Sequence, residues 1–494
     1  MDSSRSLGEL ARSIGGTVVG DLETSIADVT HDSRQAGPGS LFVAIRGGSV
    51  DGHDYIDQAV RSGASAICVS EERSVGIPQL IAADTRGVLG QLAAEVHGWP
   101  SHDIDVIGVT GTNGKTTVTH YIESLMTRSG VRTGLIGTIG TRIGGVDVPT
   151  ARTTPEASDF QRLLARMRDD GVTKAAVEVS SHALELDRVK ATRFAVAAFT
   201  NLSQDHLDFH GTMDAYRLAK ERLFFEYEIE SAVINVDDPV GADLAARIDQ
   251  RVLSVGRSGE FGYSDLSHHV TGTEFTFSSP SFERRVAAPV HGEFNVSNLV
   301  MSLACCQAAG LDLEMVVDHV ADVDIVPGRF EIIASGDGGP VVVVDYAHTP
   351  EGISKAIETA RQVGVGNVIV VFGAGGDRDR AKRPMMGEAG SAADLVVVTS
   401  DNPRSEDPDS IISQVAAAVT APLIRQVDRK VAISEALKVS SPDDIILILG
   451  KGHERGQEIG GRVIPFDDSA VAREALFRLR KSANFGPDSG SIRL

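Results

Sequence analysis

A glycine-rich loop between an apolar strand and a helix constrains this chain more than any other feature of its sequence. The loop reads Thr110-Gly111-Thr112-Asn113-Gly114-Lys115-Thr116-Thr117. An apolar run, Ile104 to Thr110, precedes it, and residues with helical periodicity, Lys115 to Arg128, follow it. Glycines let backbone amides converge on phosphate oxygens, and a helix N-terminus adds positive potential. The context therefore predicts a phosphate-binding loop in an α/β fold.

The side chains of this loop predict a nucleoside triphosphate rather than a simple anion. Lys115 can reach the β- and γ-phosphates, and the Thr116 hydroxyl can ligate magnesium. We expect such a triphosphate to contact Gly111, Thr112, Asn113, Gly114, Lys115, Thr116 and Thr117. The strict motif would place a glycine at position 109, where this chain has Val109, so the loop is a variant. The alternative is a glycine-rich turn that happens to precede a lysine.

The chain of 494 residues is too long for one hydrophobic core, so two or three domains are expected. Linker-like stretches occur at residues 99–103 and 326–328. They predict an N-terminal domain at 1–102, a central domain at 103–327 and a C-terminal domain at 328–494. Within the central domain, residues 252–290 look richer in β-structure.

The last predicted domain repeats one theme four times, in which an apolar strand ends, a polar loop follows and a helix begins. The strands are expected at 341–344, 368–372, 395–399 and 445–449. Strands that alternate with helices imply a parallel sheet with right-handed crossovers. Ligands of such sheets bind beyond the carboxyl ends of the strands. The four loops, at 345–350, 373–380, 400–404 and 450–454, are therefore expected to form one site.

Composition excludes several classes of function. The 68 acidic and 47 basic residues give a net charge of -21, which disfavours nucleic acid and anionic membranes as partners. The three cysteines, Cys68, Cys305 and Cys306, show no metal-ligand spacing and are expected to be buried thiols in a reducing cytosol. No apolar run approaches the ~20 residues that cross a bilayer. We expect a cytoplasmic protein without membrane insertion.

Candidate metal ligands follow two other apolar runs. Glu178 ends the run that begins near Ala175, and a carboxylate at such a strand end is a common magnesium position. The alternative is an edge-strand glutamate in solvent. The second run, Phe194 to Phe199, leads into residues 201–211, which are unusually dense in Asp and His. The alternative for these residues is a purely structural loop. On composition alone, Lys220 would be a lysine on a helix surface.

The form Gly-Thr-Asn-Gly-Lys-Thr-Thr occurs in Mur ligases and in the related folylpolyglutamate synthetases. From Asp32-Ser33-Arg34 to Gly450-Lys451-Gly452-His453-Glu454, the chain resembles the Mur ligase family, in its muramoyl-tripeptide synthetase branch. The resemblance implies an α/β protein of three domains: an N-terminal UDP-binding domain, a central phosphate-loop ATPase domain with a mostly parallel sheet, and a C-terminal Rossmann-like domain. It implies an ATP-dependent ligase that forms an amide bond through an acyl phosphate in peptidoglycan precursor synthesis, and thereby serves cell-wall biogenesis, cell shape and cell division.

The resemblance also implies roles for individual residues. Magnesium would be held by Thr116, Glu178, His206 and a carbamate on Lys220, and Lys115 would also be catalytic. The UDP-muramoyl dipeptide would contact Ser33, Thr153, Thr154, Ser180 and Arg188. Asn295 and Arg329 would contact ATP, although Asn295 could instead cap a helix. His348 or Asp345 would orient the amine or ADP, and the sequence does not choose between them.

The motif Asp401-Asn402-Pro403-Arg404 points to the amino acid. Proline fixes the turn, and Arg404 can bind a carboxylate through two parallel hydrogen bonds. Only meso-diaminopimelate, and not L-lysine, carries a carboxylate beside its distal amine. In the family this four-residue form marks the diaminopimelate enzymes. Arg378, Gly450 and Glu454 resemble residues that hold other parts of the amino acid. A surface salt bridge is the alternative for Arg404.

Three rival functions remain open on the sequence. They are ligation of L-lysine, folylpolyglutamate synthesis, and a nucleotide-binding switch without ligase chemistry. The partners expected under the first interpretation are ATP, magnesium, UDP-N-acetylmuramoyl dipeptide and meso-diaminopimelate. We expect the protein to be a monomer.

Overall fold

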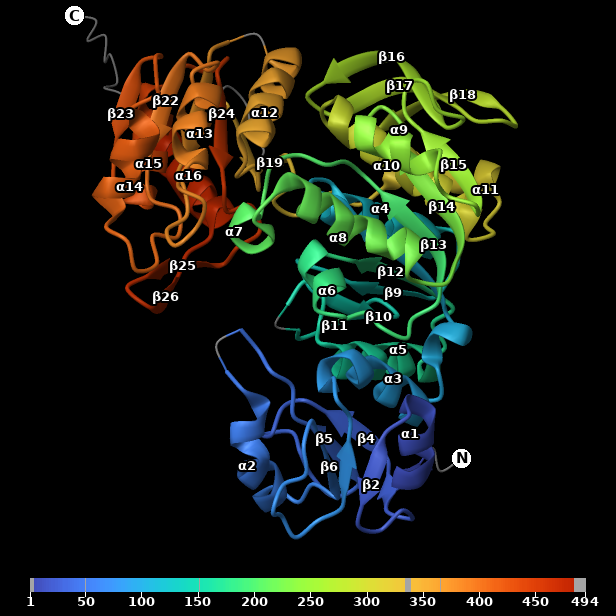
Figure 1. The fold of residues 1–494 in the computed structure, drawn as a ribbon. Helices are drawn as coiled ribbons and strands as arrows, with labels where there is room; N and C mark the ends of the chain where they lie inside the picture. The colour runs from blue at the N-terminus through green and yellow to red at the C-terminus, as the bar shows by residue number, and fades with distance from the viewer. Residues whose placement is uncertain (1–3, 49, 151, 334–338, 365, 484–494) are drawn as a thin grey trace, which may run out of the picture. The chain divides into compact units, whose positions relative to one another are not determined.

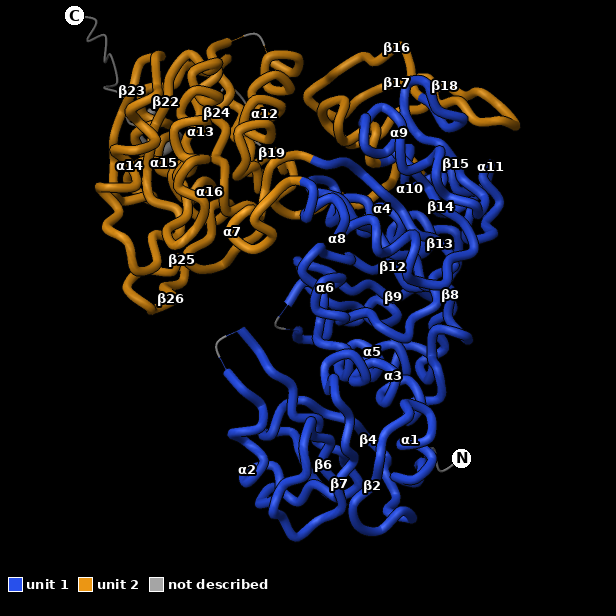
Figure 2. Tube along the Cα trace, viewed as in Figure 1, with its two compact units in different colours: residues 1–202, 214–262, 299–319 blue, residues 203–213, 263–298, 320–494 orange. Residues whose placement is uncertain are grey.

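The computed structural model describes residues 4–483 except 49, 151, 334–338 and 365 (Figure 1). These residues form two compact units, coloured separately in Figure 2. The first unit comprises residues 1–202, 214–262 and 299–319, and the second comprises 203–213, 263–298 and 320–494.

The N-terminal part of the first unit contains a five-stranded sheet in the order β2-β7-β6-β5-β4. Its strands are β2 (Thr17–Val19), β4 (Asp28–Thr30), β5 (Ser40–Val43), β6 (Ala66–Val69) and β7 (Gln79–Ile81). All neighbours run parallel except β2 and β7. Alternate strand residues face opposite sides. Leu41 and Val43 pack with α1 (Leu7–Ile14) and α3 (Thr85–Val96), whereas Phe42 packs with α2 (Ile56–Arg61).

The larger sheet of the first unit has eight strands in the order β11-β10-β9-β12-β8-β13-β14-β15. They are β8 (Asp105–Thr110), β9 (Thr133–Ile136), β10 (Thr141–Ile143), β11 (Val146–Val148), β12 (Lys174–Glu178), β13 (Phe194–Phe199), β14 (Ile229–Asn235) and β15 (Arg251–Val255). The strands from β9 to β15 in this order run parallel, and β10 and β11 add an antiparallel edge. The helix predicted after the phosphate loop is confirmed as α4 (Lys115–Arg128).

Further helices lie around this sheet. They are α5 (Ala157–Asp169), α6 (Ser181–Glu185), α8 (Met213–Phe225), α9 (Pro239–Ala245), α10 (Glu293–Ala308) and α11 (Leu313–Asp318). Ser180 and Asp238 cap α6 and α9 by accepting backbone N–H groups, and Pro239 occupies the first turn of α9. A buried core that includes Phe160, Leu164 and Leu223 joins α5 and α8 to one face of the sheet.

The second unit contains a three-stranded sheet, β16 (Gly262–His269), β17 (Gly272–Ser278) and β18 (Glu283–Ala288), which begins at the boundary of the unit. The β-rich stretch predicted near 252–290 is therefore confirmed. Its antiparallel pairing of β17 with β18 places Phe275 and Val286 opposite each other, and both are buried.

A six-stranded sheet forms the core of the second unit, in the order β19-β20-β24-β21-β22-β23. Its strands are β19 (Glu331–Ile333), β20 (Val341–Asp345), β21 (Val368–Phe372), β22 (Leu395–Val398), β23 (Leu423–Arg425) and β24 (Ile445–Leu449). All of them except β19 run parallel, as predicted for the four strands named above.

Helices cover both faces of this sheet because its strands are apolar on both sides. Val370 and Leu447 face α12 (Pro350–Val363), α13 (Lys382–Gly390) and α14 (Pro408–Ala416). Val371 and Ile448 face α15 (Arg429–Val439) and α16 (Asp468–Ala483). The predicted loops leave the strands at one edge, since the strand ends Asp345 and Leu449 are paired and so are Phe372 and Val398.

The predicted α/β class with mostly parallel sheets is confirmed. The predicted limits of the three domains, at residues 102 and 327, differ from the two units found here and stay a prediction. Within the described residues, no helix is long and apolar enough to span a bilayer.

Candidate functional site

Two glycines give the phosphate loop its backbone path after β8. Gly111 has φ 144° and Gly114 has φ 88°, which side chains of L-residues rarely adopt. A Cβ atom at Gly111 would also lie 1.8 Å from the Thr200 Oγ1 atom. The loop can therefore keep this shape only with glycine at position 111.

The end of β13 supports the same loop through hydrogen bonds that were not predicted from the sequence. The Thr112 N–H donates to Asn201 O at 2.8 Å, and the Asn113 N–H donates to Asn201 Oδ1 at 2.9 Å. The Thr200 hydroxyl donates to Asn113 O at 2.6 Å. Since β13 is the parallel neighbour of β8, a polar pair directly after an apolar strand was the available signal.

Two lysine amines meet at the start of the loop. The Lys115 Nζ atom donates to the carbonyl oxygens of Gly111 (2.9 Å) and Thr112 (2.8 Å). The Lys220 Nζ atom, from α8, donates to Gly111 O at 2.7 Å and lies 4.2 Å from the centre of the Tyr216 ring. Only 1% of Lys220 is exposed. The reading of Lys220 as a lysine on a helix surface is therefore wrong.

Glu178 ends β12, which lies between β9 and β8, and its exposed fraction is 0%. Its carboxylate accepts hydrogen bonds from the Thr116 hydroxyl (3.0 Å), the Thr138 N–H (2.8 Å) and the Thr138 hydroxyl (3.0 Å). The alternative of an edge-strand glutamate in solvent is wrong. Thr138 was not identified from the sequence, because it lies in a loop after β9 without a recognisable motif.

His206 belongs to the second unit, whereas Thr116, Glu178 and Lys220 belong to the first. The neighbouring Asp205 lies 3.2 Å from the Lys382 amine and 3.5 Å from the His348 Nε2 atom. Burial raises the pKa of Asp205, but hydrogen bonding with His348 and the charge of Lys382 outweigh it and hold that pKa well below its usual range. Among the described residues, no group of three or more His, Cys, Asp or Glu side chains is arranged to hold a metal ion. The metal role of His206 stays a prediction.

Three residues expected at the UDP-muramoyl substrate surround the end of β12. The Thr153 hydroxyl accepts a hydrogen bond from Thr138 at 3.0 Å. The Thr154 hydroxyl donates to Glu178 O at 2.7 Å, and the Ser180 hydroxyl caps α6. They therefore lie around the same strand end as the Glu178 carboxylate.

Arg188 belongs to a cluster of charges around Glu156. The Glu156 carboxylate lies 3.1 Å from both Arg86 and Arg188 and also pairs with Arg152. Burial alone would raise the pKa of Glu156, but the three guanidinium groups lower it. Ser33 lies apart from this cluster and donates to Gln58 Oε1 at 3.1 Å.

Asn295 and Arg329, the two residues outside the phosphate loop that are expected to contact ATP, lie in the second unit. Asn295 is buried inside the first turn of α10, and its Nδ2 atom donates to His291 O at 3.0 Å. The alternative of a helix cap is wrong, because the helix begins two residues earlier, and the Asn295 Oδ1 atom accepts from the Asn298 side chain at 3.4 Å. The Arg329 guanidinium lies over the Tyr346 ring, 4.5 Å from its centre.

Asp345 and His348 follow β20 and differ in their contacts. The two carboxylate oxygens of Asp345 accept backbone N–H groups from Phe330 (2.6 Å) and Ala347 (2.7 Å). Burial raises the pKa of Asp345. His348 is partly exposed, and its Nδ1 atom lies 2.9 Å from Tyr346 O.

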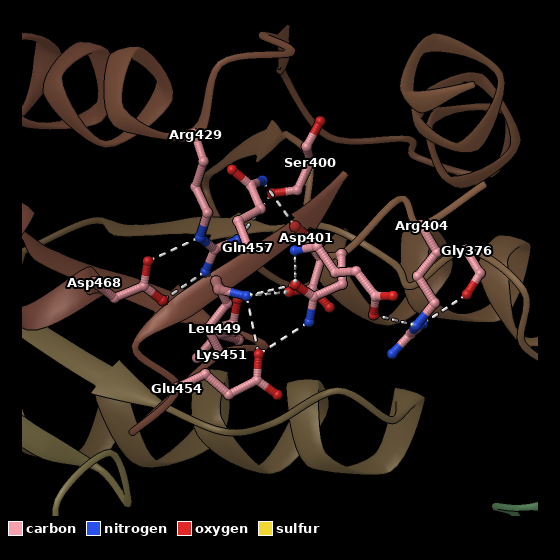
Figure 3. Close-up of polar contacts among 12 residues, drawn as sticks. Gly376, Ser400, Asp401, Arg404, Arg429, Leu449, Lys451, Glu454, Gln457 and Asp468 are labelled. Carbon is pink, nitrogen blue, oxygen red and sulfur yellow. Dashed lines mark hydrogen bonds and ion pairs between the residues drawn. The ribbon is translucent and has the colours of Figure 1, made fainter. Parts of the chain in front are cut away.

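Arg404 is held by a hairpin that the sequence analysis did not predict, β25 (Gly456–Ile459) with β26 (Arg462–Pro465). Its guanidinium donates to Gly376 O at 2.6 Å and to Glu458 Oε2 at 3.2 Å (Figure 3). Its backbone N–H donates to Glu458 O at 3.0 Å. The salt bridge that stood as the alternative for Arg404 is therefore present, and its predicted role toward a carboxylate stays a prediction.

The loops after β22 and β24 come together around Lys451. Its Nζ atom donates to Asn402 Oδ1 and to Glu454 Oε2, at 2.9 Å each, and lies 3.5 Å from Asp401 Oδ1 (Figure 3). The turn at Gly450, with φ 111°, leads from β24 into this cluster. The structure thus joins Asp401, Asn402 and Glu454, as predicted for loops at one sheet edge, and adds Lys451, which was not assigned a role.

The remaining candidates lie next to this cluster. The Gly376 N–H donates to Asn402 O at 2.9 Å, which ties the loop after β21 to the turn at Pro403. Arg378, in the same loop, is largely exposed and lies 3.6 Å from Asp208. Arg378 therefore pairs with a residue outside the Lys451 cluster.

Three stretches of the chain match family models of the Mur ligases. Residues 25–98 match the catalytic domain of the Mur ligase family, residues 109–306 match the Mur ligase middle domain, and residues 328–452 match the Mur ligase glutamate ligase domain. Together these matches cover most of the chain.

Whole proteins are similar as well. A protein of Geobacillus thermodenitrificans named UDP-N-acetylmuramoyl-L-alanyl-D-glutamate--2,6-diaminopimelate ligase is 44% identical over 464 residues, which are 91% of this chain and 95% of the relative. A protein of the same name from Halalkalibacterium halodurans is 41% identical over 470 residues, 94% of this chain and 96% of the relative. A solved structure of a ligase with that name is 31% identical, has a TM-score of 0.68, and covers 97% of this chain and 99% of its own. The chain belongs to the Mur ligase family.

Proposed function

We propose that this chain adds meso-2,6-diaminopimelate to UDP-N-acetylmuramoyl-L-alanyl-D-glutamate in an ATP-dependent ligation, a step of peptidoglycan precursor synthesis. The relatives described above are named for a ligase of these two compounds. The observation that carries the proposal is the fully buried Glu178 carboxylate, which the Thr116 hydroxyl holds at 3.0 Å beside the phosphate loop. Phosphoryl transfer from ATP needs such an acidic group to hold the cation that accompanies the phosphates.

The reaction requires activation, because a carboxylate does not react with an amine at neutral pH. The γ-phosphoryl group of ATP passes to the D-glutamyl carboxylate, so the bond between the γ-phosphorus and the β–γ bridging oxygen breaks, and ADP and an acyl phosphate form. The amine of the diamino acid then attacks the acyl carbon. Phosphate leaves with the bonding electrons, and the amine gives up a proton as the amide forms. Lys115 would exchange its contacts with Gly111 O and Thr112 O for phosphate oxygens.

The side chains beside the loop fit a magnesium ion. Magnesium prefers oxygen ligands and is usually held by one or two carboxylates together with substrate phosphates. Thr116 and Glu178 provide a hydroxyl and a carboxylate that already contact each other. We propose that they hold the ion together with His206 and a carbamate on Lys220. When bound, the ion offsets the negative charge of the phosphate oxygens.

The UDP-muramoyl dipeptide is proposed to contact Ser33, Thr153, Thr154, Ser180 and Arg188. The three arginines around Glu156 support this placement, since they leave an excess of positive charge within a chain of net charge -21. Such an excess suits the carboxylate or phosphate groups of that substrate.

The amino acid is proposed to bind with its distal carboxylate on Arg404. The guanidinium would then exchange Glu458 Oε2, now at 3.2 Å, for the substrate carboxylate. Asp401, Asn402, Pro403, Gly450, Glu454 and Arg378 would hold the other parts of the molecule. Both oxygens of Asp345 are taken by backbone N–H groups, which favours His348 as the group that orients the incoming amine. Asn295 and Arg329 are proposed to contact ATP.

Release of inorganic phosphate tests this function. Purified protein with ATP and magnesium should release phosphate only when UDP-N-acetylmuramoyl-L-alanyl-D-glutamate and meso-diaminopimelate are both present. Lys115→Ala should lower the rate at least 100-fold, because the phosphates lose their main cationic partner. Absence of release from the unaltered protein with both compounds would refute the proposal, and equal turnover with L-lysine would refute the choice of amino acid.

The wider setting of the reaction is proposed on the same basis. The division into domains at 1–102, 103–327 and 328–494 is a proposal, and so are the cytoplasmic location, the monomeric state and the contribution to cell shape and cell division. The matched family stretches, 25–98, 109–306 and 328–452, support the three-domain division because each falls within one proposed domain.

A further inference from the structure

Lys451 is a buried charged side chain that the proposed reaction does not use. It follows β24 directly after Gly450, and 0% of its side chain is exposed. Burying an ammonium group is costly unless it is both paired and hydrogen-bonded. The contacts with Asn402 and Glu454 at 2.9 Å, and with Asp401 at 3.5 Å, meet this requirement with groups from the two loops that carry the proposed amino-acid site (Figure 3).

Lys451 also fixes which way the Asn402 amide points. The Asn402 Oδ1 atom accepts from Lys451 Nζ at 2.9 Å and from the Glu458 N–H at 3.0 Å. The Asn402 Nδ2 atom donates to Glu454 Oε2 at 2.9 Å. A flipped amide would place its NH2 group against two donors. The ammonium therefore holds the Asn402 amide and the Glu454 carboxylate in one relative orientation.

The charge of Lys451 matters as well as its hydrogen bonds. The cluster contains two carboxylates, Asp401 and Glu454, against the one ammonium of Lys451. The adjacent Arg429 and Asp468 form a fully buried pair whose charges cancel. Loss of the ammonium would remove the cation that contacts both carboxylates, and a site that has become more negative would favour a ligand end that carries only an amine.

We propose that Lys451 is a positioning residue that sets the choice of amino acid. By holding Asn402 and Glu454 and offsetting one negative charge, it matches the site to a distal end that carries an amine and a carboxylate together, and not to the bare ammonium of L-lysine. This inference rests on the proposed function.

Variants at position 451 test the inference through amino-acid selectivity. Lys451→Met removes the charge and the hydrogen bonds, Lys451→Gln removes the charge but keeps N–H donors on a side chain one atom shorter, and Lys451→Arg keeps the charge. Phosphate release is measured against meso-diaminopimelate and against L-lysine, with ATP and the UDP-linked dipeptide saturating. The KM values for ATP and for the dipeptide are measured in parallel.

Lys451→Met and Lys451→Gln should raise the KM for meso-diaminopimelate at least tenfold. They should lower the ratio of kcat/KM for meso-diaminopimelate to that for L-lysine at least tenfold, with the KM values for the other two substrates within about twofold. Lys451→Arg should keep the ratio within about threefold. If Lys451→Met does not yield folded protein, Lys451→Gln carries the test.

A loss of kcat/KM by the same factor for both amino acids would overturn the inference and leave the proposed function intact. So would a rise in all three KM values together, because a role in folding alone predicts that result. Failure of the unaltered protein to turn over either amino acid would overturn the proposed function, and the inference with it.

Discussion

Lys220 is buried on α8 with its amine directed at the phosphate loop. Its Nζ atom has Gly111 O at 2.7 Å and the face of the Tyr216 ring at 4.2 Å. Burial of a charged amine is costly, since only 1% of Lys220 is exposed, and a neutral amine can take up carbon dioxide to become an anionic carbamate. This setting supports the proposed modification of Lys220.

Replacement of Lys220 by alanine tests the modification. Lys220→Ala should lower ligase activity at least 100-fold, because one proposed ligand of the ion is lost. Added acetate or formate should restore part of the activity by supplying a carboxylate in the space left by the side chain. Steady-state phosphate release with increasing carboxylate concentration measures both effects.

Lys174 provides the matched control, since it lies in the same unit at the other end of β12, paired with Asp105 at 2.5 Å. Lys174→Ala should keep its activity within about threefold and should not respond to carboxylates. Full activity of Lys220→Ala without any additive would rule out the carbamate.

At the level of elements, one buried ion pair supports the ends of two strands of the second unit, β22 and β24. The Arg429 side chain, from α15, pairs with Asp468 of α16 at 2.7 Å, and both side chains are fully buried. The guanidinium also donates to Leu449 O at 2.8 Å and Ser400 O at 3.4 Å (Figure 3). It thus satisfies the carbonyl groups where β22 and β24 lead into the loops of the proposed amino-acid site.

Breaking this pair should destabilise the second unit. Arg429→Met should lower the free energy of unfolding by about 3–5 kcal/mol, because it leaves the Asp468 carboxylate buried without its partner. The double variant Arg429→Met with Asp468→Leu should lose less than Arg429→Met alone. Urea denaturation of the whole chain measures the effect.

The pair of Lys430 with Glu474 joins the same two helices at the surface and serves as the control. Lys430→Met should cost less than about 1 kcal/mol, as exposed pairs usually do. An Arg429→Met variant as stable as the unaltered protein would contradict the role assigned to the buried pair.

Elements with clear periodicity could be predicted from the sequence, and short or exposed ones could not. The helix from Lys115 to Arg128 and the strands at 368–372 and 445–449 were expected with the bounds that the structure shows. The hairpin of β25 and β26 was not, because its apolar residues Val463 and Ile464 are exposed and leave no burial pattern. The contacts of Arg404 with that hairpin were therefore also missed.

The residues of the candidate site also divide into those that could be placed from the sequence and those that could not. Residues inside a motif, such as Thr116, could be placed because one strand and one helix set their position. Lys220 and Lys451 could not be read as buried from the local sequence, since elements distant in the chain bury them. Their environment depends on the order of the strands, which local periodicity does not report.

At the level of the whole molecule, two histidines make stability depend on pH. Burial and the charge of His268 lower the pKa of His291 to about 4. Burial and the charge of Arg329 lower the pKa of His453 to about 4. Among the described residues, neither Nδ1 atom has a hydrogen-bond partner. The folded chain therefore keeps both rings neutral at pH values where an unfolded chain protonates them.

The sign of the pH effect follows from proton binding. Between pH 4 and 6.5 the unfolded state binds more protons, so the free energy of unfolding should rise with pH in that window. Each histidine adds a slope of at most about 1.4 kcal/mol per pH unit within that window. The free energy of unfolding is therefore highest above pH 6.5 and decreases as the pH falls toward 4. Urea denaturation at pH 4.5, 5.5 and 6.5 measures the slope.

The variants His291→Phe and His453→Phe should each flatten that slope. The exposed His269 provides the control, and His269→Phe should leave the slope unchanged. A slope that stays the same after replacement of both buried histidines would show that other groups cause the pH dependence.

The interleaving of the two units along the chain has a consequence for how they form. Three segments of each unit alternate, so the backbone passes between the units at five junctions (Figure 2). A single cut therefore never yields two pieces that each correspond to one unit. During synthesis on the ribosome, the first unit must wait for residues 299–319, and by then two segments of the second unit have already emerged.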